Sequence, residues 1–413
     1  MSRDSSVNSH RMSRRSVLRT AGGLAAAGAV GGAATAVTGR SASAAPATFT
    51  HPGMLHAYGE LNRAKVYVAQ GKEPWLSGWN RLTANSHSAG SWVANPQATV
   101  YRGSGYPENY GTLYNDIHAA YQNALRWKIA GTTANGDCAR DILNAWSAKL
   151  TKIDGNADRF LASGIYGYQF ANAAELMRDY NGFDLARFKT MMLNVFYPLN
   201  NDFLLNHNTA CVTNYWANWD LCNMNSILAI AVLCDDGAKY DRAVNYFKNG
   251  AGNGSVNHAV PFLYDSQGLA QWQESGRDQG HTMMGMGQMG AFCEMAWSQG
   301  DDLYGYGGNR FMKAAEYVAK YNLGDSVPFT TYTWGSGQNC AQMSQTVISP
   351  DSRGQVRPVW DQLYYHYAGR QKLSVPNIAA MAAQGRPEGG GGDYGTTSGG
   401  FDQLGFGTLM YAK

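Results

Sequence analysis

Apolar residues recur at helical spacing through most of the chain after residue 110. Within Leu113–Ile129, Ile117, Ala120, Tyr121 and Ala124 stand at i, i+3, i+4 and i+7, as on one face of an α-helix. Strand-like alternation is scarce, and Phe329–Trp334 shows it best. The same helical pattern predicts further helices over Ala139–Ile153, Ala162–Tyr180, Ala186–Phe203, Tyr215–Leu233, Tyr240–Lys248, Asp278–Ser298 and Arg310–Tyr321.

The segments between these predicted helices are short and carry helix-stopping glycines. Examples are Gly131, Gly155, Gly182, Gly237 and Gly300. Helices of similar length joined by short turns pack as antiparallel pairs. We therefore predict an all-α fold with little β-structure, in which helix pairs follow one another around an incomplete barrel, an (α/α) toroid. A helical solenoid is the alternative, but the sequence has no clear repeat of fixed length.

The first 45 residues predict an export signal rather than part of the fold. Arg14 and Arg15 form a twin-arginine pair, an Ala/Gly-rich apolar stretch follows over 21–37, and Ala42-Ser43-Ala44 provides small residues for cleavage. The apolar stretch is too short and too rich in Ala and Gly to predict a membrane span. We expect residues 1–45 to be a twin-arginine signal peptide and residues 46–413 to form a single domain. The mature protein is then secreted or periplasmic and free of the membrane.

Removing this leader changes the charge of the chain. The whole sequence carries 33 Lys and Arg against 30 Asp and Glu, whereas the first 44 residues hold six Arg and one Asp, so the remainder has a net charge of −2. That balance gives no broad basic surface and argues against nucleic acid as a partner. The 25 Tyr and 11 Trp, against 14 Phe, combine an apolar face with a polar edge. This bias suits a carbohydrate cleft, and equally a large core built from amphipathic aromatics.

Several motifs of cofactor and metal chemistry are missing. The chain has no Walker loop, no HExxH, no GxSxG elbow and no dinucleotide fingerprint after a predicted strand. None of the six cysteines belongs to a CxxC pair, and no Asp-rich loop suggests a calcium site. We expect no cofactor and no metal. The cysteines leave one or two disulfide bridges open.

The richest candidate site lies in the segment Glu274–His281. At about 100° per residue, Glu274, Arg277, Asp278 and His281 fall on one face if this segment enters a helix. The helix predicted to follow is strongly apolar and should be buried, so four ionisable groups at its start are costly unless they pair or function. Two interpretations stay open: a functional cluster, or an internal Glu–Arg–Asp network that anchors the helix.

A second polar stripe precedes another apolar helix. Asn214, Asn218 and Asn225 share one helical face, and Trp219 stands beside them in the sequence. Neutral amides are well suited to bind a carboxylate. The structural interpretation is helix capping, for which Asn214 is well placed, together with buried hydrogen bonding.

Tyrosines and a glycine run form a third set of candidates. Tyr365 lies on a predicted helix, and a phenol hydroxyl acts as acid or base when a nearby cation lowers its pKa. Tyr166 and Tyr168 are weaker candidates, and core packing is the alternative for all three. Arg386 precedes Gly389–Gly392, a run that predicts a mobile loop which either borders a cleft or simply connects two elements.

These candidate segments give the chain a family likeness. Their most specific pieces are Asn218-Trp219-Asp220, Glu274–His281 and Gly399-Gly400-Phe401-Asp402-Gln403-Leu404-Gly405. Nearly all of the chain after the leader resembles the alginate lyase family, in the branch of bacterial glucuronan and alginate lyases. The resemblance implies a chondroitin-lyase-type α/α toroid. The stretches that carry it are 214–236, 273–290, 301–329 and 386–409.

The resemblance also implies a reaction, the cleavage of uronic-acid polymers by β-elimination. One group neutralises the C5 carboxylate, a base removes the C5 proton, and an acid protonates O4 as the C4–C5 double bond forms. Stabilising the developing enolate is the largest electrostatic contribution, and general acid–base help adds about 10²–10⁴-fold. The expected partner is therefore an anionic polysaccharide.

Related lyases use Asn or Gln, His, Arg and Tyr, and the resemblance assigns those roles here. Asn218 would bind the carboxylate with help from Gln279, His281 would be the base or the carboxylate partner, Arg277 would position a tyrosine or the substrate, and Tyr365 would be the acid. The better-known members join Asn and His in one motif and place a Tyr soon after the Arg, and this sequence does neither. Further candidate substrate contacts are Asn214, Trp219, Glu274, Tyr166, Tyr168 and Arg386.

Two other functions fit parts of the sequence. A toroidal glycoside hydrolase would use Glu274 and Asp278 as its carboxylate pair. Arg277 between them would hold both ionised, however, whereas a general acid needs a raised pKa. A non-catalytic carbohydrate-binding protein would keep the aromatic residues but would not need His281.

Overall fold

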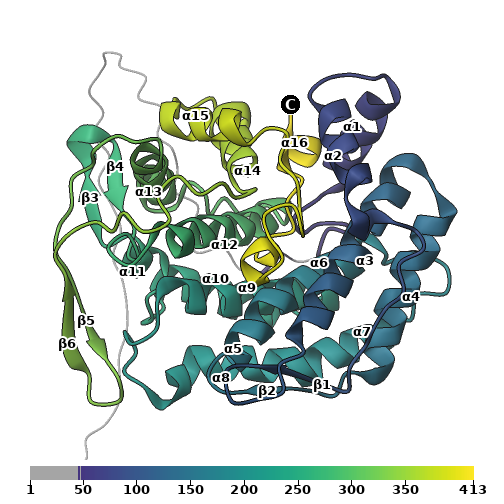
Figure 1. Ribbon diagram of the computed structural model, residues 1–413, viewed down its shortest axis with the longest axis horizontal. Helices are drawn as coiled ribbons and strands as arrows, with labels where there is room; N and C mark the ends of the chain where they lie inside the picture. The colour runs from purple at the N-terminus through teal and green to yellow at the C-terminus, as the bar shows by residue number, and fades with distance from the viewer. Residues whose placement is uncertain (1–44, 47) are drawn as a thin grey trace, which may run out of the picture. The chain divides into compact units, whose positions relative to one another are not determined.

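The computed structural model describes residues 45, 46 and 48–413. The signal peptide predicted for residues 1–45 lies outside this part of the chain except for Ala45. The described residues are mostly helical (Figure 1). The helices are α1 (Tyr58–Ala69), α2 (Trp75–Ala84), α3 (Tyr110–Ala130), α4 (Thr133–Lys149), α5 (Arg159–Leu161), α6 (Gly167–Leu176), α7 (Leu185–Met191), α8 (Tyr197–Asn206), α9 (Ala217–Cys234), α10 (Gly237–Asn249), α11 (Val256–Ala259), α12 (Gln279–Ser298), α13 (Tyr306–Asn322), α14 (Trp360–Tyr364), α15 (Pro376–Gly385) and α16 (Gly407–Tyr411).

The helices form an inner and an outer layer. Along the inner layer α3 packs against α6, α6 against α9, α9 against α12, and α12 against α14. The outer layer places α4 on α3, α10 on α9, and α13 on α12, so that consecutive helices pair across the two layers. At the C-terminus α16 packs against α1, α2 and α14, which joins the two ends of the helical array (Figure 1). This arrangement of helix pairs confirms the predicted fold class.

The inner helices α9 and α12 are apolar on nearly every side. Almost all of their residues are buried, including the run Ile227–Leu233 in α9 and all five methionines of α12. A helix that is hydrophobic all round needs neighbours all round. The packing of α9 against α6, α8, α10 and α12 supplies them.

The strands are short and form three separate pairs. The first pair is parallel, and the other two are antiparallel. The helix predicted over Ala139–Ile153 ends at Lys149, because Lys152–Gly155 pairs with Thr99–Arg102 instead. The predicted strand Phe329–Trp334 is confirmed with a shift, as β5. The strands are β1 (Thr99–Arg102), β2 (Lys152–Gly155), β3 (Phe262–Tyr264), β4 (Leu269–Gln271), β5 (Tyr332–Ser336) and β6 (Ala341–Gln345).

The glycine run Gly389–Gly392 is not the mobile loop that its composition predicted. Gly389, Gly390 and Gly391 are buried, and only Gly392 is exposed. A Cβ on Gly391 would come within 2.2 Å of His118 Nδ1, and one on Gly390 within 2.2 Å of the Phe406 ring. The glycines are therefore needed for close packing of the C-terminal segment against the inner helices, not for flexibility.

Two further features concern the cysteines and the question of a membrane-spanning helix. Cys211 and Cys340 form a disulfide that links the segment before α9 to the β5–β6 hairpin. Four described cysteines, Cys138, Cys222, Cys234 and Cys293, are free. None of the helices in the described part of the chain is long and apolar enough to cross a membrane.

Candidate active site

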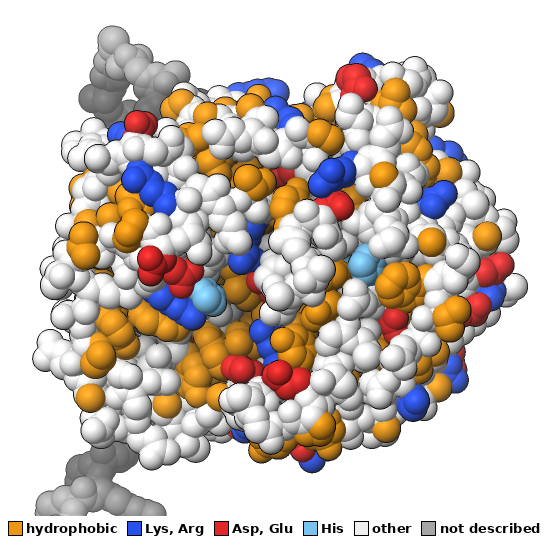
Figure 2. Space-filling model, viewed as in Figure 1, with side chains coloured by type: hydrophobic (Ala, Val, Ile, Leu, Met, Phe, Trp, Pro, Cys, Tyr) orange, Lys and Arg blue, Asp and Glu red, His pale blue; other side chains and the backbone are white. Residues whose placement is uncertain are grey.

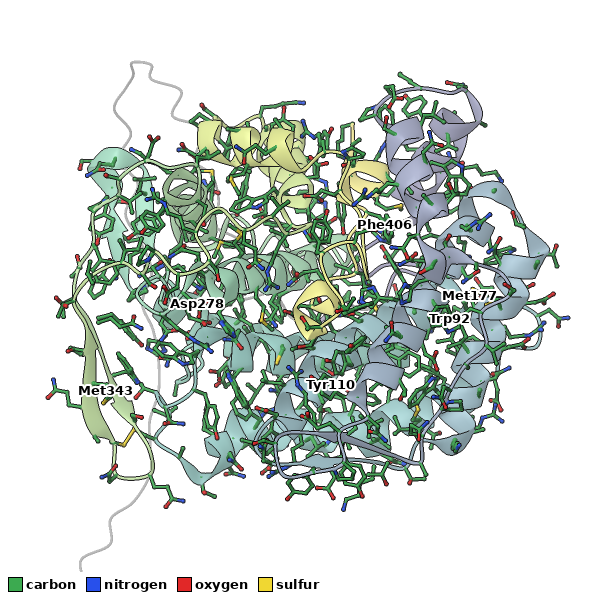
Figure 3. All side chains as sticks on the ribbon, viewed as in Figure 1. Trp92, Tyr110, Met177, Asp278, Met343 and Phe406 are labelled. Carbon is green, nitrogen blue, oxygen red and sulfur yellow. A yellow bond between two sulfur atoms is a disulfide. The ribbon has the colours of Figure 1, made fainter. Side chains whose placement is uncertain are left out.

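A cleft of about 370 Å³ opens where the N-terminal ends of α9 and α12 meet the C-terminal segment. Figure 2 shows a hollow in the middle of this face, with basic, acidic and histidine side chains around it. Figure 3 places Asp278 at the start of α12 and Tyr110 at the start of α3, on either side of that region. The charged and polar residues that line the cleft include Arg102, Asp158, Asn218, Arg277, His281, Arg357 and Asp402.

The two helix N-termini meet because α9 is capped by the segment that leads into α12. The Asn218 backbone N–H donates to Glu274 Oε1 at 2.9 Å, and the Ala217 N–H donates to Gln273 Oε1 at 3.0 Å. These bonds satisfy backbone donors that a helix leaves unpaired at its start. The Glu274 carboxylate also lies at the positive end of the α9 dipole, which stabilises it there. Local capping thus brings the two predicted polar stripes together.

Asp278 caps α12 and also holds the imidazole of His281. Its Oδ1 accepts the His281 backbone N–H at 2.7 Å, and its Oδ2 lies 2.7 Å from His281 Nδ1. Burial raises the pKa of Asp278, but the hydrogen bonds from His281 and the charge of Arg277 outweigh it, so the pKa lies below its usual value. Asp278 is therefore a carboxylate at neutral pH and a firm hydrogen-bond acceptor.

The partners of His281 fix its tautomer. A carboxylate only accepts, so Nδ1 carries the proton that Asp278 binds. Arg277 Nη2 lies 3.2 Å from His281 Nε2, and a guanidinium only donates, so Nε2 holds a lone pair. The side chain is 43% exposed and lines the cleft. His281 thus presents a basic nitrogen to the cleft, as general-base catalysis requires.

Arg277 connects the pair formed by His281 and Asp278 to the buried Glu274 behind it. Its Nη1 donates to Glu274 Oε2 at 3.0 Å, and its guanidinium lies 5.1 Å from the centre of the Trp216 ring. Glu274 is fully buried, and its two oxygens also accept Asn218 Nδ2 at 2.9 Å each. The network therefore combines both interpretations of Glu274–His281. Glu274 anchors the start of α9 and Arg277 from inside the protein, while Arg277 and His281 face the cleft.

This geometry changes the expected role of Asn218. The residue lines the cleft, as predicted, but its amide N–H group is turned to Glu274 rather than offered to a ligand. Gln279, its predicted helper, is buried and does not line the cleft. Its amide donates to the carbonyl of Ser349 at 3.0 Å and accepts from Asn322 Nδ2 at 3.0 Å. The structure therefore does not support direct binding of the substrate carboxylate by the side-chain amides of Asn218 and Gln279.

The opposite side of the cleft carries charges that sequence reasoning missed. Arg102 stands at the end of β1, with its guanidinium 5.0 Å from the centre of the Tyr110 ring and Nη1 3.3 Å from the Tyr166 hydroxyl. Within residues 48–413, no carboxylate pairs with it. Arg357 donates to Asp402 Oδ2 at 2.9 Å. Asp402 belongs to one of the family-like stretches, whereas nothing local in the sequence singles out Arg102 or Arg357.

Other predicted contacts lie behind or beside the cleft. Trp219 lines it. Tyr166 is buried one layer behind Arg102, and Tyr168 is buried with its hydroxyl donating to the Asp402 carbonyl at 2.9 Å. Burial raises the pKa of both phenols, so neither is a base at neutral pH. Asn214 does not cap α9, which begins after Trp216. Its Oδ1 instead accepts the Gly337 N–H at 2.6 Å.

Tyr365 and Arg386 do not reach the cleft, and the acid role expected for Tyr365 is not supported. Tyr365 begins a π-helical turn, Tyr365–Arg370, and the Arg386 guanidinium lies 5.1 Å from its ring centre. Burial raises the pKa of Tyr365 to about 12, and Arg386 opposes this only in part. Arg386 is itself bound to Asp361, its Nε donating to Oδ1 at 2.6 Å.

Metal ligands are not clustered in the part of the chain that the structure describes. No three His, Cys, Asp or Glu side chains there are arranged to hold an ion.

Comparisons with known proteins give one family match and several structural matches. The alginate lyase family model matches residues 81–329. Alginate lyase A1-III from Sphingomonas species A1 superposes with a TM-score of 0.57 at 14% identity, covering 89% of this chain and 98% of that one. A variant of that enzyme bound to a tetrasaccharide gives 0.56 at 15% identity, covering 89% and 97%.

An alginate lyase from Bacteroides ovatus gives a TM-score of 0.58 at 12% identity, covering 88% of this chain and 100% of that one. Identities this low show the fold, and they confirm the α/α toroid. No curated protein matches the sequence. The family match spans more than half of the chain and includes both halves of the network that joins α9 to α12. The chain therefore belongs to the alginate lyase family and is a polysaccharide lyase that acts on uronic-acid polymers.

Proposed function

We propose that the cleft breaks polymers of glucuronate or mannuronate by β-elimination, with His281 as the base. The observation that carries the proposal is the tautomer of His281. Asp278 holds its Nδ1 proton at 2.7 Å, while Nε2 faces the cleft beside the cation of Arg277. Once Arg277 releases it, the lone pair on Nε2 is placed to take a proton from a bound sugar.

Arg277 and Arg102 are suited to bind the substrate carboxylate. Both line the cleft, and a guanidinium forms paired hydrogen bonds with a carboxylate. When Arg277 turns an N–H towards the substrate, it releases Nε2 of His281. Binding and base activation are then coupled, because the same cation serves both in turn. Neutralising the C5 carboxylate makes the C5 proton more acidic and stabilises the enolate that forms.

In the elimination that we propose, the imidazole of His281 acts first as the base and then as the acid. Nε2 takes the C5 proton, the C5–H electrons form the C4–C5 double bond, and the C4–O4 bond breaks with its electron pair on O4. The imidazolium is stabilised by Asp278 and returns the proton to O4, which leaves His281 neutral. One residue can do both only when the C5 hydrogen and O4 lie on the same side of the ring. That holds in glucuronate and mannuronate and fails in guluronate, and this supports the proposed substrates.

A hydrolytic use of this site has weaker support. The pair considered for hydrolysis was Glu274 and Asp278, but Glu274 is fully buried and both of its oxygens accept hydrogen bonds. Asp278 has a lowered pKa and cannot keep the proton that a general acid needs at neutral pH.

We also propose that the protein is exported. The support is the order of features in the leader, namely Arg14-Arg15, an apolar stretch and a small-residue cleavage site. An enzyme that cuts large polysaccharides meets its substrate outside the cytoplasm. Fusing residues 1–45 to a reporter that folds before transport, with and without Arg14→Lys and Arg15→Lys, tests it: export should be lost in the double variant. Export that persists would contradict the twin-arginine assignment.

A panel of polymers tests the activity. We expect glucuronan or mannuronan to yield the ultraviolet absorbance of an unsaturated uronate, in equal number with new reducing ends, and guluronan to react more slowly. Reducing ends without that absorbance would show hydrolysis. Fast cleavage of guluronan would contradict the single-residue mechanism, because its C5 hydrogen and O4 lie on opposite sides.

A further inference from the structure

Two tryptophans lie next to Arg277, just outside the residues that line the cleft. Trp216 precedes α9, and Trp334 lies on β5; their ring centres are 5.0 Å apart at an interplanar angle of 49°. The Arg277 guanidinium lies 5.1 Å from the Trp216 ring centre, and Arg277 lines the cleft. The two indoles therefore lie directly beside the proposed catalytic groups.

Both indoles are half-buried, so each keeps part of its surface open to a ligand. Tyr332 is buried and packs against Trp334, with the two ring centres 5.9 Å apart and the rings nearly parallel. Hydrophobic side chains gather between the hairpin and the hollow (Figure 2), and Met343 marks the hairpin in Figure 3. We call Trp216 and Trp334 the aromatic shelf.

The shelf is held in place by bonds between the hairpin and the segment before α9. Thr213 Oγ1 accepts the Gly335 N–H at 2.9 Å and donates to the Gly335 carbonyl at 3.0 Å. Asn214 Oδ1 accepts the Gly337 N–H at 2.6 Å. The Cys211–Cys340 disulfide closes the same junction. These contacts fix the strand that carries Trp334 against the segment that carries Trp216.

We propose that the aromatic shelf is a sugar-binding subsite for a residue of the same polymer, beyond the pair of sugars at the bond that breaks. The inference rests on the proposed function. A pyranose ring has an apolar C–H face that stacks on an indole, while its hydroxyls stay in water. Indoles already fixed by packing lose little entropy when a ligand binds. The disulfide and Asn214 act as positioning elements, because they set the shelf but do not touch the sugar.

The test compares substrates of different length. In Trp334→Ala, the KM for long glucuronan should rise about fivefold to tenfold, and the rate on the shortest glucuronan oligosaccharide that is still cleaved should be unchanged. Trp334→Phe should restore most of the loss. Thr333→Ala is the matched control, since Thr333 is exposed on the same strand and its side chain points to the other face. Circular dichroism checks that each variant folds.

The outcomes separate the two proposals. An equal loss on long and short substrates, or no loss on either, overturns the subsite. If the wild-type protein forms no unsaturated product from any polymer, the proposed function fails. In that case, calorimetric binding of glucuronan to the wild-type protein and to Trp334→Ala tests whether the aromatic shelf binds sugar. Weaker binding by the variant supports the subsite, and equal binding overturns it.

Discussion

Two clusters in this molecule are built from the same kinds of residue, yet only one is open. In the cleft, Arg277 stands between Glu274 and Asp278 and lies over Trp216. In the second cluster, Arg386 pairs with Asp361 next to Glu388 and lies over the rings of Tyr364 and Tyr365. The side chain of His281 is 43% exposed, whereas Asp361 and Glu388 are fully buried beneath the C-terminal segment.

The pKa values of Asp361 and Glu388 are shifted in the opposite direction to that of Asp278. Burial is the largest influence on Asp361 and Glu388, and it raises the pKa of both, Glu388 most of all, with the charge of Asp361 adding to the effect. At Asp278 the hydrogen bonds from His281 prevail, and the pKa falls. The open cluster therefore keeps a charged acceptor behind His281, whereas in the closed one burial favours the protonated form of Glu388. Catalysis needs the first arrangement.

The largest effect should come from Asp278→Asn. The substitution removes the charge that holds the Nδ1 proton and stabilises the imidazolium, so kcat should fall on the order of 10²–10⁴-fold. Asn caps a helix about as well as Asp, so the unfolding temperature should change little. Initial rates and thermal unfolding measure the two quantities. A rate close to that of the wild type would show that Asp278 acts only as a helix cap.

The same substitution at two arginines sharpens the comparison. Arg102→Met removes an unpaired cation from the cleft, and KM for glucuronan should rise about tenfold. Arg386→Met should leave KM unchanged but lower the free energy of unfolding by about 1–3 kcal/mol, because a buried oxygen of Asp361 loses its hydrogen bond from Arg386. Steady-state kinetics and urea unfolding distinguish the two. Equal effects of both variants on KM would mean that the clusters are not functionally distinct.

The closed cluster should make stability depend on pH. The carboxyl of Glu388 has a usual pKa of 4.5 and a raised one in the folded protein. As pH rises above that usual value, the unfolded chain loses the proton first, so stability falls by up to about 1.4 kcal/mol per pH unit until the folded pKa is reached. Glu388→Gln should weaken this fall. Urea unfolding at about pH 5 and pH 8 measures this fall, and an unchanged pH dependence in Glu388→Gln would contradict the raised pKa of Glu388.

The smallest effect is expected for Tyr365→Phe. Its hydroxyl does not line the cleft, so kcat should change by less than about twofold, which corresponds to about 0.4 kcal/mol. Initial rates on glucuronan check this. A large loss of activity would restore Tyr365 as the acid and would require the chain to rearrange on binding.

The sequence predicted well whatever depends on local spacing. The helical pattern located α3, α9, α12 and their neighbours, and the spacing of Arg277, Asp278 and His281 placed those side chains together. These relations span a few residues, but the helix expected from Glu274 onwards begins only at Gln279, so a turn and the extended N-cap Asp278, rather than a helical face, bring Arg277 and Asp278 to His281.

The rest depends on contacts between distant segments. Arg102 and Asp402 meet the cleft from strand β1 and from the C-terminal segment, about 300 residues apart, so no local pattern could place them there. Tyr365 looked like a candidate acid because sequence does not show burial. Gly389–Gly392 looked mobile because the need for close packing is visible only when His118 and Phe406 are placed against it.

One measurement tests the central claim directly, namely that Nε2 of His281 takes the C5 proton. Wild type, His281→Ala and His281→Gln are given glucuronan, and the formation of unsaturated uronate is followed beside the binding of the polymer and the unfolding temperature. Both variants should bind the polymer and unfold near the wild-type temperature while forming product at least about 10²-fold more slowly. A folded His281→Ala protein that forms unsaturated product at the wild-type rate would contradict the account.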